Sequence, residues 1–391
     1  MIYSKHRGRF AVATAMAIAA ALLVTALAGC GTSQDEATQG GAVPEQQAST
    51  QTVTDMVGRT VEVPAKAEKV IGIGSSSLRL IAYLEAVDAV VGVEQSELED
   101  NVTCSYRHVY HDTLKNLPVI GDGGSKGVTP NEEAIMQAAP EVVFASIDKD
   151  AADSLQEKTG IPVVCLTLSD VVFDQVFYDN VNLVGSIVGK QDRADEIVAY
   201  MKDTQQDLEQ RTSGIAEADK KTAYAAGISF RGGHGFAGTE AHFPPFEETG
   251  VENIADVAGA SGAFDIDLEK VTAAQPDCIF VEGSNLPLVK EDYDNNPGYF
   301  TELKAVQDRQ TYTLISYRFY ATNIELALAN CYQVGAMAYP DRYKDVDPTA
   351  KLDEITEFFL GKKLSADLAA EGYEFKLCGN KKARDKGSPA R

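Results

Sequence analysis

The sequence predicts an α/β protein built from two α/β lobes, a single long bridging helix and a ligand cleft between the lobes. The first observation is an amphipathic helix expected over residues 191–213, near the middle of the chain. The second is an internal repeat, because residues 133–144 and 269–280 share one spacing of Glu, Pro, an acid and Phe. Each copy is interpreted as a short helix stopped by proline and followed by a buried strand, the repeating step of a parallel sheet.

The central helix is predicted because the segment has one apolar face and because typical helix-start and helix-stop residues lie at its two ends. Its apolar positions recur at helical spacing: Ala194, Ile197, Val198, Met201 and Leu208. Acidic residues begin it, and Arg211 followed by Gly214 ends it. At about 1.5 Å per residue it is roughly 30 Å long. An ordinary surface helix of one large domain would look the same, and the repeat favours two lobes.

Local patterns predict the remaining elements. Residues 54–64 indicate a hairpin that turns near Gly58, followed by a strand at 69–74, a helix at 76–86 and a strand at 89–93. A strand is expected at 222–230, an apolar helix at 324–338 and a further helix at 353–360. The expected division of the chain is: signal peptide 1–29, flexible tether 30–51, N-terminal lobe 52–190, bridging helix 191–213, C-terminal lobe 214–340, helical extension 341–378 and disordered basic tail 379–391.

The N-terminus carries an export signal. Three basic residues precede an apolar run from Phe10 to Ala26, and Leu27-Ala28-Gly29-Cys30 follows. That tetrapeptide resembles the bacterial lipobox, which implies cleavage before Cys30 and a lipid on its sulfur. The chain would then hang from the extracytoplasmic face of a cell membrane by a tether poor in large apolar side chains. The alternative is a retained membrane anchor over 10–29.

Charge and cysteine content narrow the function classes. The chain has 35 Lys and Arg against 58 Asp and Glu, a formal net charge of −23. That balance argues against nucleic acid and anionic lipid as partners. Five cysteines follow Cys30 without CxxC spacing, which favours buried free thiols over metal ligands.

Several motifs together carry a family resemblance. They are Asp55-x-x-Gly58-Arg59-x-Val61-x-Val63-Pro64, the strand end at 70–75, Leu117 to Gly121, both repeat copies, Asn253-Ile254-Ala255 and Asn296 to Phe300. The ordered set, over about residues 52–340, resembles the helix-bridged (class III) substrate-binding proteins of iron-siderophore, haem and cobalamin ABC importers. The resemblance implies two Rossmann-like lobes, no enzymatic activity and no cofactor. It also implies a monomer that delivers its ligand to an ABC permease with its ATPase, docking through Glu133 on one lobe and Glu269 on the other.

Candidate ligand contacts follow from where parallel strands end, since ligands of open α/β sheets bind beyond the carboxyl ends of the strands. Two segments there, 106–111 and 317–320, interleave arginine with aromatic residues. Arginine offers a fork for carboxylate, catecholate or hydroxamate oxygens, and tyrosine offers a flat face with a polar tip. The expected contacts are Ser75, Ser76, Tyr106, Arg107, His108, Ser146, Arg231, His234, Tyr317, Arg318 and Tyr320.

The identity of the ligand is left open by these patterns. Free divalent metal would require His with Asp or Glu from both lobes. Separately, a lone His in a glycine loop could ligate haem iron or hydrogen-bond a ligand oxygen, and His234, which lies among glycines after a strand, is the best single candidate. Molybdate or tungstate could be held by Arg107, Arg231 and Arg318. A GxSxG match at Ser125 keeps a serine hydrolase as a remote alternative, and an adhesin without a permease is another. A GxGxxG match at 233–238 is set aside because prolines follow it where a phosphate-binding helix would begin.

Overall fold

The computed structural model describes residues 49–124, 127–168, 171–230, 232–257 and 259–378. These residues lie within one compact unit. Cys30, the signal and most of the tether, together with Ser125, Arg231 and the tail 379–391, fall outside them. In the part of the chain described, no helix combines the length and apolar character that crossing a membrane requires.

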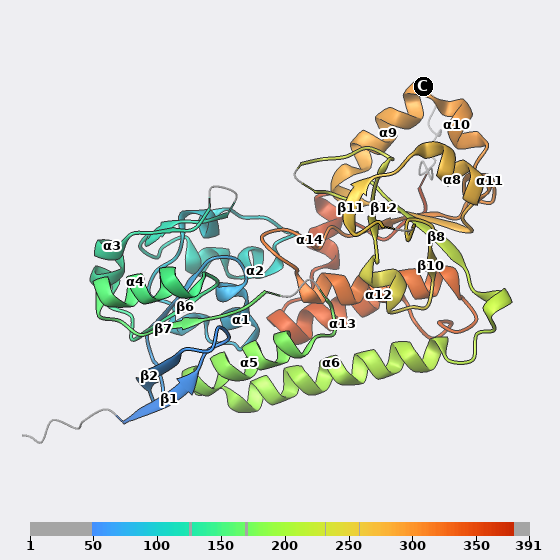
Figure 1. Ribbon diagram of the computed structural model, residues 1–391. Helices are drawn as coiled ribbons and strands as arrows, with labels where there is room; N and C mark the ends of the chain where they lie inside the picture. The colour runs from blue at the N-terminus through green and yellow to red at the C-terminus, as the bar shows by residue number, and fades with distance from the viewer. Residues whose placement is uncertain (1–48, 125–126, 169–170, 231, 258, 379–391) are drawn as a thin grey trace, which may run out of the picture. The chain divides into compact units, whose positions relative to one another are not determined.

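The N-terminal lobe is built on a parallel sheet of order β3-β6-β7 (Figure 1). Its strands are β3 (Val70–Ile73), β6 (Val142–Ala145) and β7 (Val163–Cys165), all fully buried. Its helices are α1 (Ser77–Tyr83), α2 (Ser105–Leu114), α3 (Glu132–Ala138), α4 (Lys149–Thr159) and α5 (Gln175–Val188). A short antiparallel pair, β4 (Gly121–Asp122) and β5 (Thr129–Pro130), completes the lobe.

Two expectations in this lobe need correction. The helix expected over 76–86 ends at Tyr83. Residues 89–93 do not form the expected continuous strand, because a 3₁₀ turn takes up Val87–Ala89. Two isolated parallel bridges, Val70 with Val90 and Val93 with Val119, still place this run beside β3.

The C-terminal lobe repeats the plan with a parallel sheet of order β10-β8-β12-β13. The strands are β8 (Thr222–Ala226), β10 (Glu252–Asn253), β12 (Cys278–Glu282) and β13 (Thr311–Leu314), beside a separate antiparallel pair, β9 (Gly238–Ala241) and β11 (Gly262–Asp265). The helices are α7 (Pro244–Glu247), α8 (Leu268–Ala274), α9 (Leu286–Asn295), α10 (Pro297–Thr301) and α11 (Lys304–Gln307). The strand expected to reach residue 230 stops at Ala226, because Gly227 turns the chain with φ 69°.

The internal repeat is confirmed down to backbone conformation. Helix α3 leads through Pro140 into β6, and α8 leads through Pro276 into β12. The residue before each proline, Ala139 or Gln275, is left-handed, with φ 50° and 47°. Proline cannot continue the helix, so in each lobe the chain leaves it through the same turn and enters a central strand.

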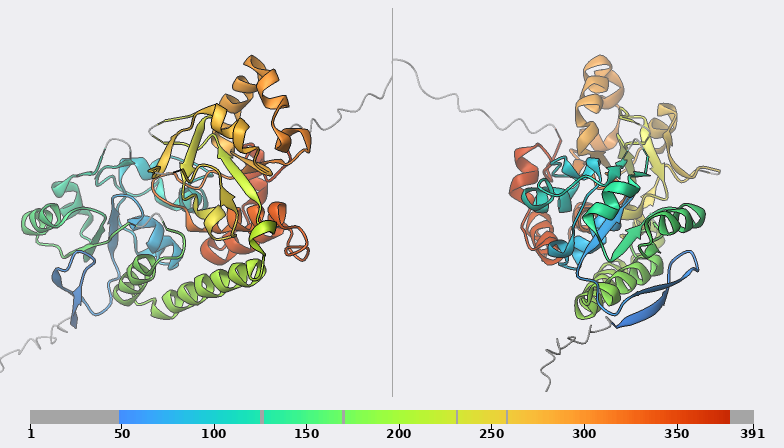
Figure 2. Two further views of the ribbon diagram at one scale, coloured as in Figure 1. Left: turned by 45° about the vertical axis from the view of Figure 1, so that its right-hand side comes forward. Right: turned by 90° about the vertical axis from the view of Figure 1, so that its left-hand side faces the viewer.

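The bridging helix is α6 (Gln191–Thr212), an unbroken ribbon in Figures 1 and 2. Its buried face carries Ala194, Ile197, Met201, Thr204 and Leu208. Near one end, Arg193 Nε donates to the carbonyl of Tyr83 in the N-terminal lobe at 3.2 Å. Near the other, Arg211 pairs with Asp345 at 2.8 Å, beyond the C-terminal sheet. One apolar cluster includes α6 and buried residues of both sheets, so the helix belongs to a core shared by the two lobes.

The chain beyond α12 (Ile324–Ala338) also contacts both lobes. In α13 (Pro348–Leu360), Phe358 stacks on Tyr200 of α6 at 4.0 Å, and Phe359 meets Tyr83 of α1 edge-on at 5.0 Å. After α14 (Ser365–Ala370) the chain pairs with β13, with Leu377 forming a bridge to Tyr312. The segment expected to be a helical extension therefore contains two helices and ends in an isolated bridge to the edge of the C-terminal sheet.

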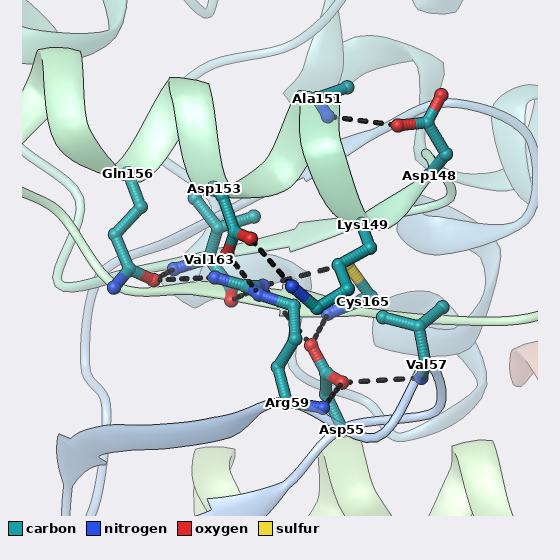
Figure 3. Close-up of polar contacts among 10 residues, drawn as sticks. All are labelled: Asp55, Val57, Arg59, Asp148, Lys149, Ala151, Asp153, Gln156, Val163 and Cys165. Carbon is teal, nitrogen blue, oxygen red and sulfur yellow. Dashed lines mark hydrogen bonds and ion pairs between the residues drawn. The ribbon is translucent and has the colours of Figure 1, made fainter.

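The N-terminal hairpin is attached through the arginine of its Asp-x-x-Gly-Arg motif. Strands β1 (Thr50–Thr54) and β2 (Thr60–Pro64) pair as expected, and Gly58 turns with φ 80°. Arg59 enters the lobe and donates to Asp55 at 3.1 Å, to Asp153 of α4 at 2.7 Å and to the Val163 carbonyl of β7 at 2.8 Å (Figure 3). One buried cation thus joins hairpin, helix and sheet.

The five cysteines of the described residues are free thiols, as expected. Cys104, Cys165, Cys278 and Cys331 are buried, and Cys378 is partly exposed. Burial raises the pKa of Cys278 to about 11, which disfavours the thiolate form that reacts or binds metal.

Candidate functional site

Serines mark the carboxyl ends of β3 and β6. Ser75 and Ser76 follow β3, Ser146 follows β6, and all three are partly exposed. The hydroxyl of Ser77 connects the two strand ends, since it donates to the Ile73 carbonyl at 2.8 Å and lies 3.1 Å from the Ser146 hydroxyl. These serines therefore lie together at the expected edge of the N-terminal sheet.

A buried cluster lies next to this edge and contains two of the expected ligand contacts. The Tyr106 hydroxyl and the Arg107 Nε both donate to Glu97, at 2.8 Å and 2.7 Å. All three side chains are almost inaccessible to solvent. Tyr106 and Arg107 thus lie beneath the surface, and Glu97 compensates the charge of Arg107.

A polar contact between the lobes joins Tyr320, one of the expected ligand contacts, to Arg79 and Glu94, which the expected contacts do not include. Arg79 of α1 donates to the carbonyl oxygens of Tyr320 at 2.8 Å and Phe319 at 3.1 Å. The Tyr320 hydroxyl donates to Glu94 at 2.5 Å, and its ring lies under the Arg107 guanidinium, 4.5 Å from the ring centre. We call this contact between Phe319–Tyr320 and the N-terminal lobe the seam.

A signal for Glu94 was present in the sequence. Glu94 follows Val93 directly, at the end of the expected strand 89–93, and ligands of open α/β sheets bind beyond such strand ends. Burial raises the pKa of Glu94 to about 7, although the hydrogen bond from Tyr320 opposes the shift. No comparable signal marked Arg79, which is buried within α1.

Polar side chains also gather at the carboxyl ends of the C-terminal strands. Glu282 ends β12 and accepts a hydrogen bond from the Ser229 amide at 2.6 Å. Arg318 forms an ion pair with Glu240, and Tyr317 is buried. A small pocket of about 10 Å³, enough for one water molecule, lies here. It is lined by Ile228, Ser229, Phe243, Glu282, Leu314, Ile315, Tyr317, Arg318 and Asn330.

The histidines do not converge. His108 bridges Asp100 at 2.8 Å and Asp367 of α14 at 3.2 Å. His234 stacks on Phe230 at 3.6 Å and contacts Asp265 at 3.0 Å. No group of three or more His, Cys, Asp and Glu side chains suited to a metal ion occurs within the ranges that the structure describes.

Both predicted docking glutamates lie on exposed helix starts. Glu133 is in the first turn of α3, capped by Asn131, and Glu269 is in the first turn of α8, capped by Asp267. The neighbouring Glu132 forms an ion pair with Lys158 at 2.9 Å. Within the described residues neither Glu133 nor Glu269 forms an ion pair through its carboxylate, so each is presented to solvent on equivalent elements of the two lobes.

A family profile described as periplasmic binding protein matches residues 70–317, which include both sheets and the bridging helix. The chain belongs to the periplasmic binding protein family. Its members are non-enzymatic components of transport, and this periplasmic binding protein is a substrate-binding protein of ABC importers.

Three relatives give the range of similarity. YvrC of Bacillus subtilis, an uncharacterized ABC transporter substrate-binding lipoprotein, is 24% identical over 52% of this chain and 61% of its own length, so this chain spans about three fifths of it. The molybdate-binding protein MolA of Haemophilus influenzae is 22% identical over 81% of this chain and 93% of its own. The iron-uptake system-binding protein of Bacillus subtilis is 25% identical over 74% of this chain and 87% of its own.

A solved structure supports the fold of this periplasmic binding protein. The TroA-like periplasmic binding protein FepB from Veillonella parvula superimposes with a TM-score of 0.63, at 24% identity, over 80% of this chain and 97% of its own. The two α/β lobes predicted from the repeat are thereby confirmed as the fold of the family.

Proposed function

We propose that the protein is a lipid-anchored, extracytoplasmic binding protein that captures an anionic metal chelate, an iron(III)-siderophore in the first place, and delivers it to an ABC importer. The proposed ligands also include two bulkier metal complexes, haem and a corrinoid. The observation that carries it is that Arg79, Arg107 and Arg318 each lie over an aromatic ring, near the ends of the strands of both sheets.

That combination suits a chelate for two physical reasons. Guanidinium groups bind the carboxylate, catecholate or hydroxamate oxygens that surround the metal, often through two parallel hydrogen bonds. Aromatic faces contact the organic scaffold of the ligand and supply apolar area without many rotatable bonds. Ser75, Ser76 and Ser146 add hydroxyl groups at the N-terminal edge, and His234 and Arg231 are the proposed contacts from the loop after β8.

The position of the histidines supports a chelate over a bare metal ion. His108 is paired with Asp100 and Asp367, and His234 is paired with Asp265. A bare divalent cation needs several such ligands pointing at one place. A chelate arrives with its metal already coordinated and requires only donors to its oxygens.

A second candidate ligand is a group 6 oxyanion. The likeness to the molybdate-binding protein MolA extends over most of both chains, which favours molybdate or tungstate held by arginine side chains. Both candidates are anions with several oxygen acceptors, so the same arginines would serve either ligand.

Isothermal titration calorimetry on residues 49–391 tests the proposal. The panel is ferric citrate, a ferric trihydroxamate, a ferric tricatecholate, haemin, cyanocobalamin, sodium molybdate and zinc chloride. We expect saturable one-to-one binding of one ferric chelate with a dissociation constant in the micromolar range or below. Binding of molybdate alone would select the second candidate, and binding of zinc alone would contradict both.

The anchor and the docking surface complete the proposal. Acylation at Cys30 would be detected as incorporation of labelled palmitate that is lost in Cys30→Ala. Glu133 and Glu269 are the proposed contacts for arginines of the permease, because each is an exposed carboxylate on an equivalent helix of its lobe.

A further inference from the structure

The seam contains an unusual stretch of backbone. Tyr320 and Ala321 follow one another in left-handed conformations, with φ 52° and 69°. Side chains with a Cβ disfavour that region, and two such residues in succession persist only where surrounding contacts hold them. Contacts within its own lobe hold this stretch. The Asn323 side-chain amide donates to the carbonyls of Tyr317 at 2.9 Å and Phe319 at 3.3 Å, and Arg318 forms a bridge with Thr322. Further contacts come from the opposite lobe.

Arg79 is the main contact from the opposite lobe, and its own partners are poorly matched to its charge. It is 1% exposed, and its guanidinium donates to the carbonyls of Phe319 and Tyr320 and to the Ser76 hydroxyl at 2.9 Å. No carboxylate of the described residues forms an ion pair with it. A buried guanidinium that donates only to neutral acceptors would be stabilised further by hydrogen bonds to an anionic oxygen.

The surroundings of the Tyr320 ring contain further polar atoms without partners. Glu94 Oε1, Ser96 Oγ and Arg107 Nη2 are buried and form no hydrogen bond within the described residues. Gly123 leaves the space that the phenol occupies, since a Cβ there would lie 2.7 Å from the Tyr320 hydroxyl oxygen. Buried polar groups are nearly always hydrogen-bonded, so these atoms indicate a site built for a more polar occupant than a tyrosine ring.

We propose that the segment Phe319–Ala321 competes with the ligand, its two carbonyls taking the places on Arg79, and its phenol ring the place beside Arg107, that oxygens of an anionic ligand take. The inference rests on the proposed function. It further specifies that the ligand presents an anionic group, a carboxylate, a phenolate or a metal oxyanion, to Arg79 and Arg107. Binding would release the segment and relieve its backbone strain. Because a ligand must displace the segment, a weakly acidic or neutral ligand would bind with lower apparent affinity than a strongly anionic one.

The test compares Tyr320→Phe with wild type, and uses Tyr293→Phe as the control because that phenol is 43% exposed on α9. Removing the hydrogen bond to Glu94 weakens the competitor without touching Arg79. We expect Tyr320→Phe to bind the anionic probe that wild type binds, whether ferric citrate, ferric tricatecholate or sodium molybdate, about three- to tenfold more tightly. Tyr293→Phe should match wild type.

Hydrogen-deuterium exchange of the peptide covering 317–323 gives a readout that needs no ligand. Faster exchange in Tyr320→Phe than in Tyr293→Phe supports a segment held by its side chain, and equal exchange overturns the proposal. Tighter binding supports competition, whereas weaker binding makes Tyr320 an ordinary ligand contact and overturns it. If no probe binds wild type, the proposed function fails and the exchange comparison still decides whether the segment is held as described.

Discussion

The Tyr83 hydroxyl donates a hydrogen bond to Glu325, and this pair joins α1 of the N-terminal lobe to α12 of the C-terminal lobe. Both side chains are fully buried. Burial, followed by the nearby Glu325 carboxylate, raises the pKa of Tyr83 well above its usual range, so the phenol remains a donor. The lobes are therefore joined near their core by a polar contact as well as by apolar packing.

Tyr83→Phe should lower the free energy of unfolding by about 1–3 kcal/mol, because it leaves a buried carboxylate oxygen of Glu325 without its donor. The measurement is urea unfolding followed by circular dichroism. Tyr293→Phe, which removes an exposed phenol, should change the value by less than about 0.5 kcal/mol. An equal, small effect of both changes would show that the contact between Tyr83 and Glu325 contributes little.

Ligand binding should move the lobes by only a few ångströms or degrees. Helix α6 packs into a core shared by both sheets, and Phe359 of α13 adds an aromatic contact to Tyr83. Because these contacts pack the two lobes against shared elements, large rotations of one lobe relative to the other are disfavoured. Small-angle X-ray scattering with and without saturating ligand should show nearly the same radius of gyration, and a large compaction would contradict this expectation.

Arg59→Lys should destabilise the N-terminal lobe by about 3 kcal/mol, since lysine cannot reproduce a planar fork that contacts three elements at once. Arg59 bonds Asp55, Asp153 and the Val163 carbonyl while only 7% exposed (Figure 3). Arg342→Lys is the matched control, because Arg342 is exposed and donates to a single carbonyl, that of Ser213. Similar losses in both variants would mean that the buried contacts of Arg59 add no stability.

The sequence predicted the fold better than it predicted the site, for a physical reason. Periodicity and prolines are local signals, and they were enough for the repeat around Pro140 and Pro276 and for the bridging helix. The seam depends on contacts between residues more than two hundred positions apart, such as Arg79 with Tyr320. A buried arginine in a short helix gives no periodic signal, so Arg79 was missed although Ser76, three residues earlier, was selected.

Glu94 should make stability depend on pH. Its pKa of about 7 in the folded protein exceeds the value of 4.5 for an ordinary glutamate, so folding takes up a proton between these values. The contribution is fully present below about pH 4.5, declines as pH rises, and is lost above about pH 7. We expect the free energy of unfolding of wild type to fall by up to about 3 kcal/mol more than that of Glu94→Gln across this range.

Glu248 provides the comparison for that prediction. Burial raises its pKa to about 7 as well, with the neighbouring Glu247 as the next cause, and it lies away from the seam. Glu248→Gln should therefore reduce the same pH dependence without affecting ligand binding. Identical pH profiles for wild type and Glu94→Gln, from urea unfolding at pH 4.5, 6 and 8, would show that Glu94 is ionised like an exposed carboxylate.

Charge reversal at both proposed docking glutamates should separate delivery of the ligand from its capture. Glu133 and Glu269 are exposed in the first turns of α3 and α8, far in sequence from the seam, so Glu133→Lys with Glu269→Lys should leave ligand affinity within about twofold of wild type. Uptake by cells should fall by about tenfold or more, because like charges would then meet at the permease.

Asp203→Lys is the control for this double change, since Asp203 lies on an exposed face of α6 and reversal there alters net charge without altering either docking helix. If uptake survives reversal at Glu133 and Glu269 while ligand binding is intact, the two carboxylates do not dock. A loss of uptake with Asp203→Lys as well would indicate a general effect of charge. Only a loss confined to the paired helices places the permease contact on the equivalent elements of the repeat.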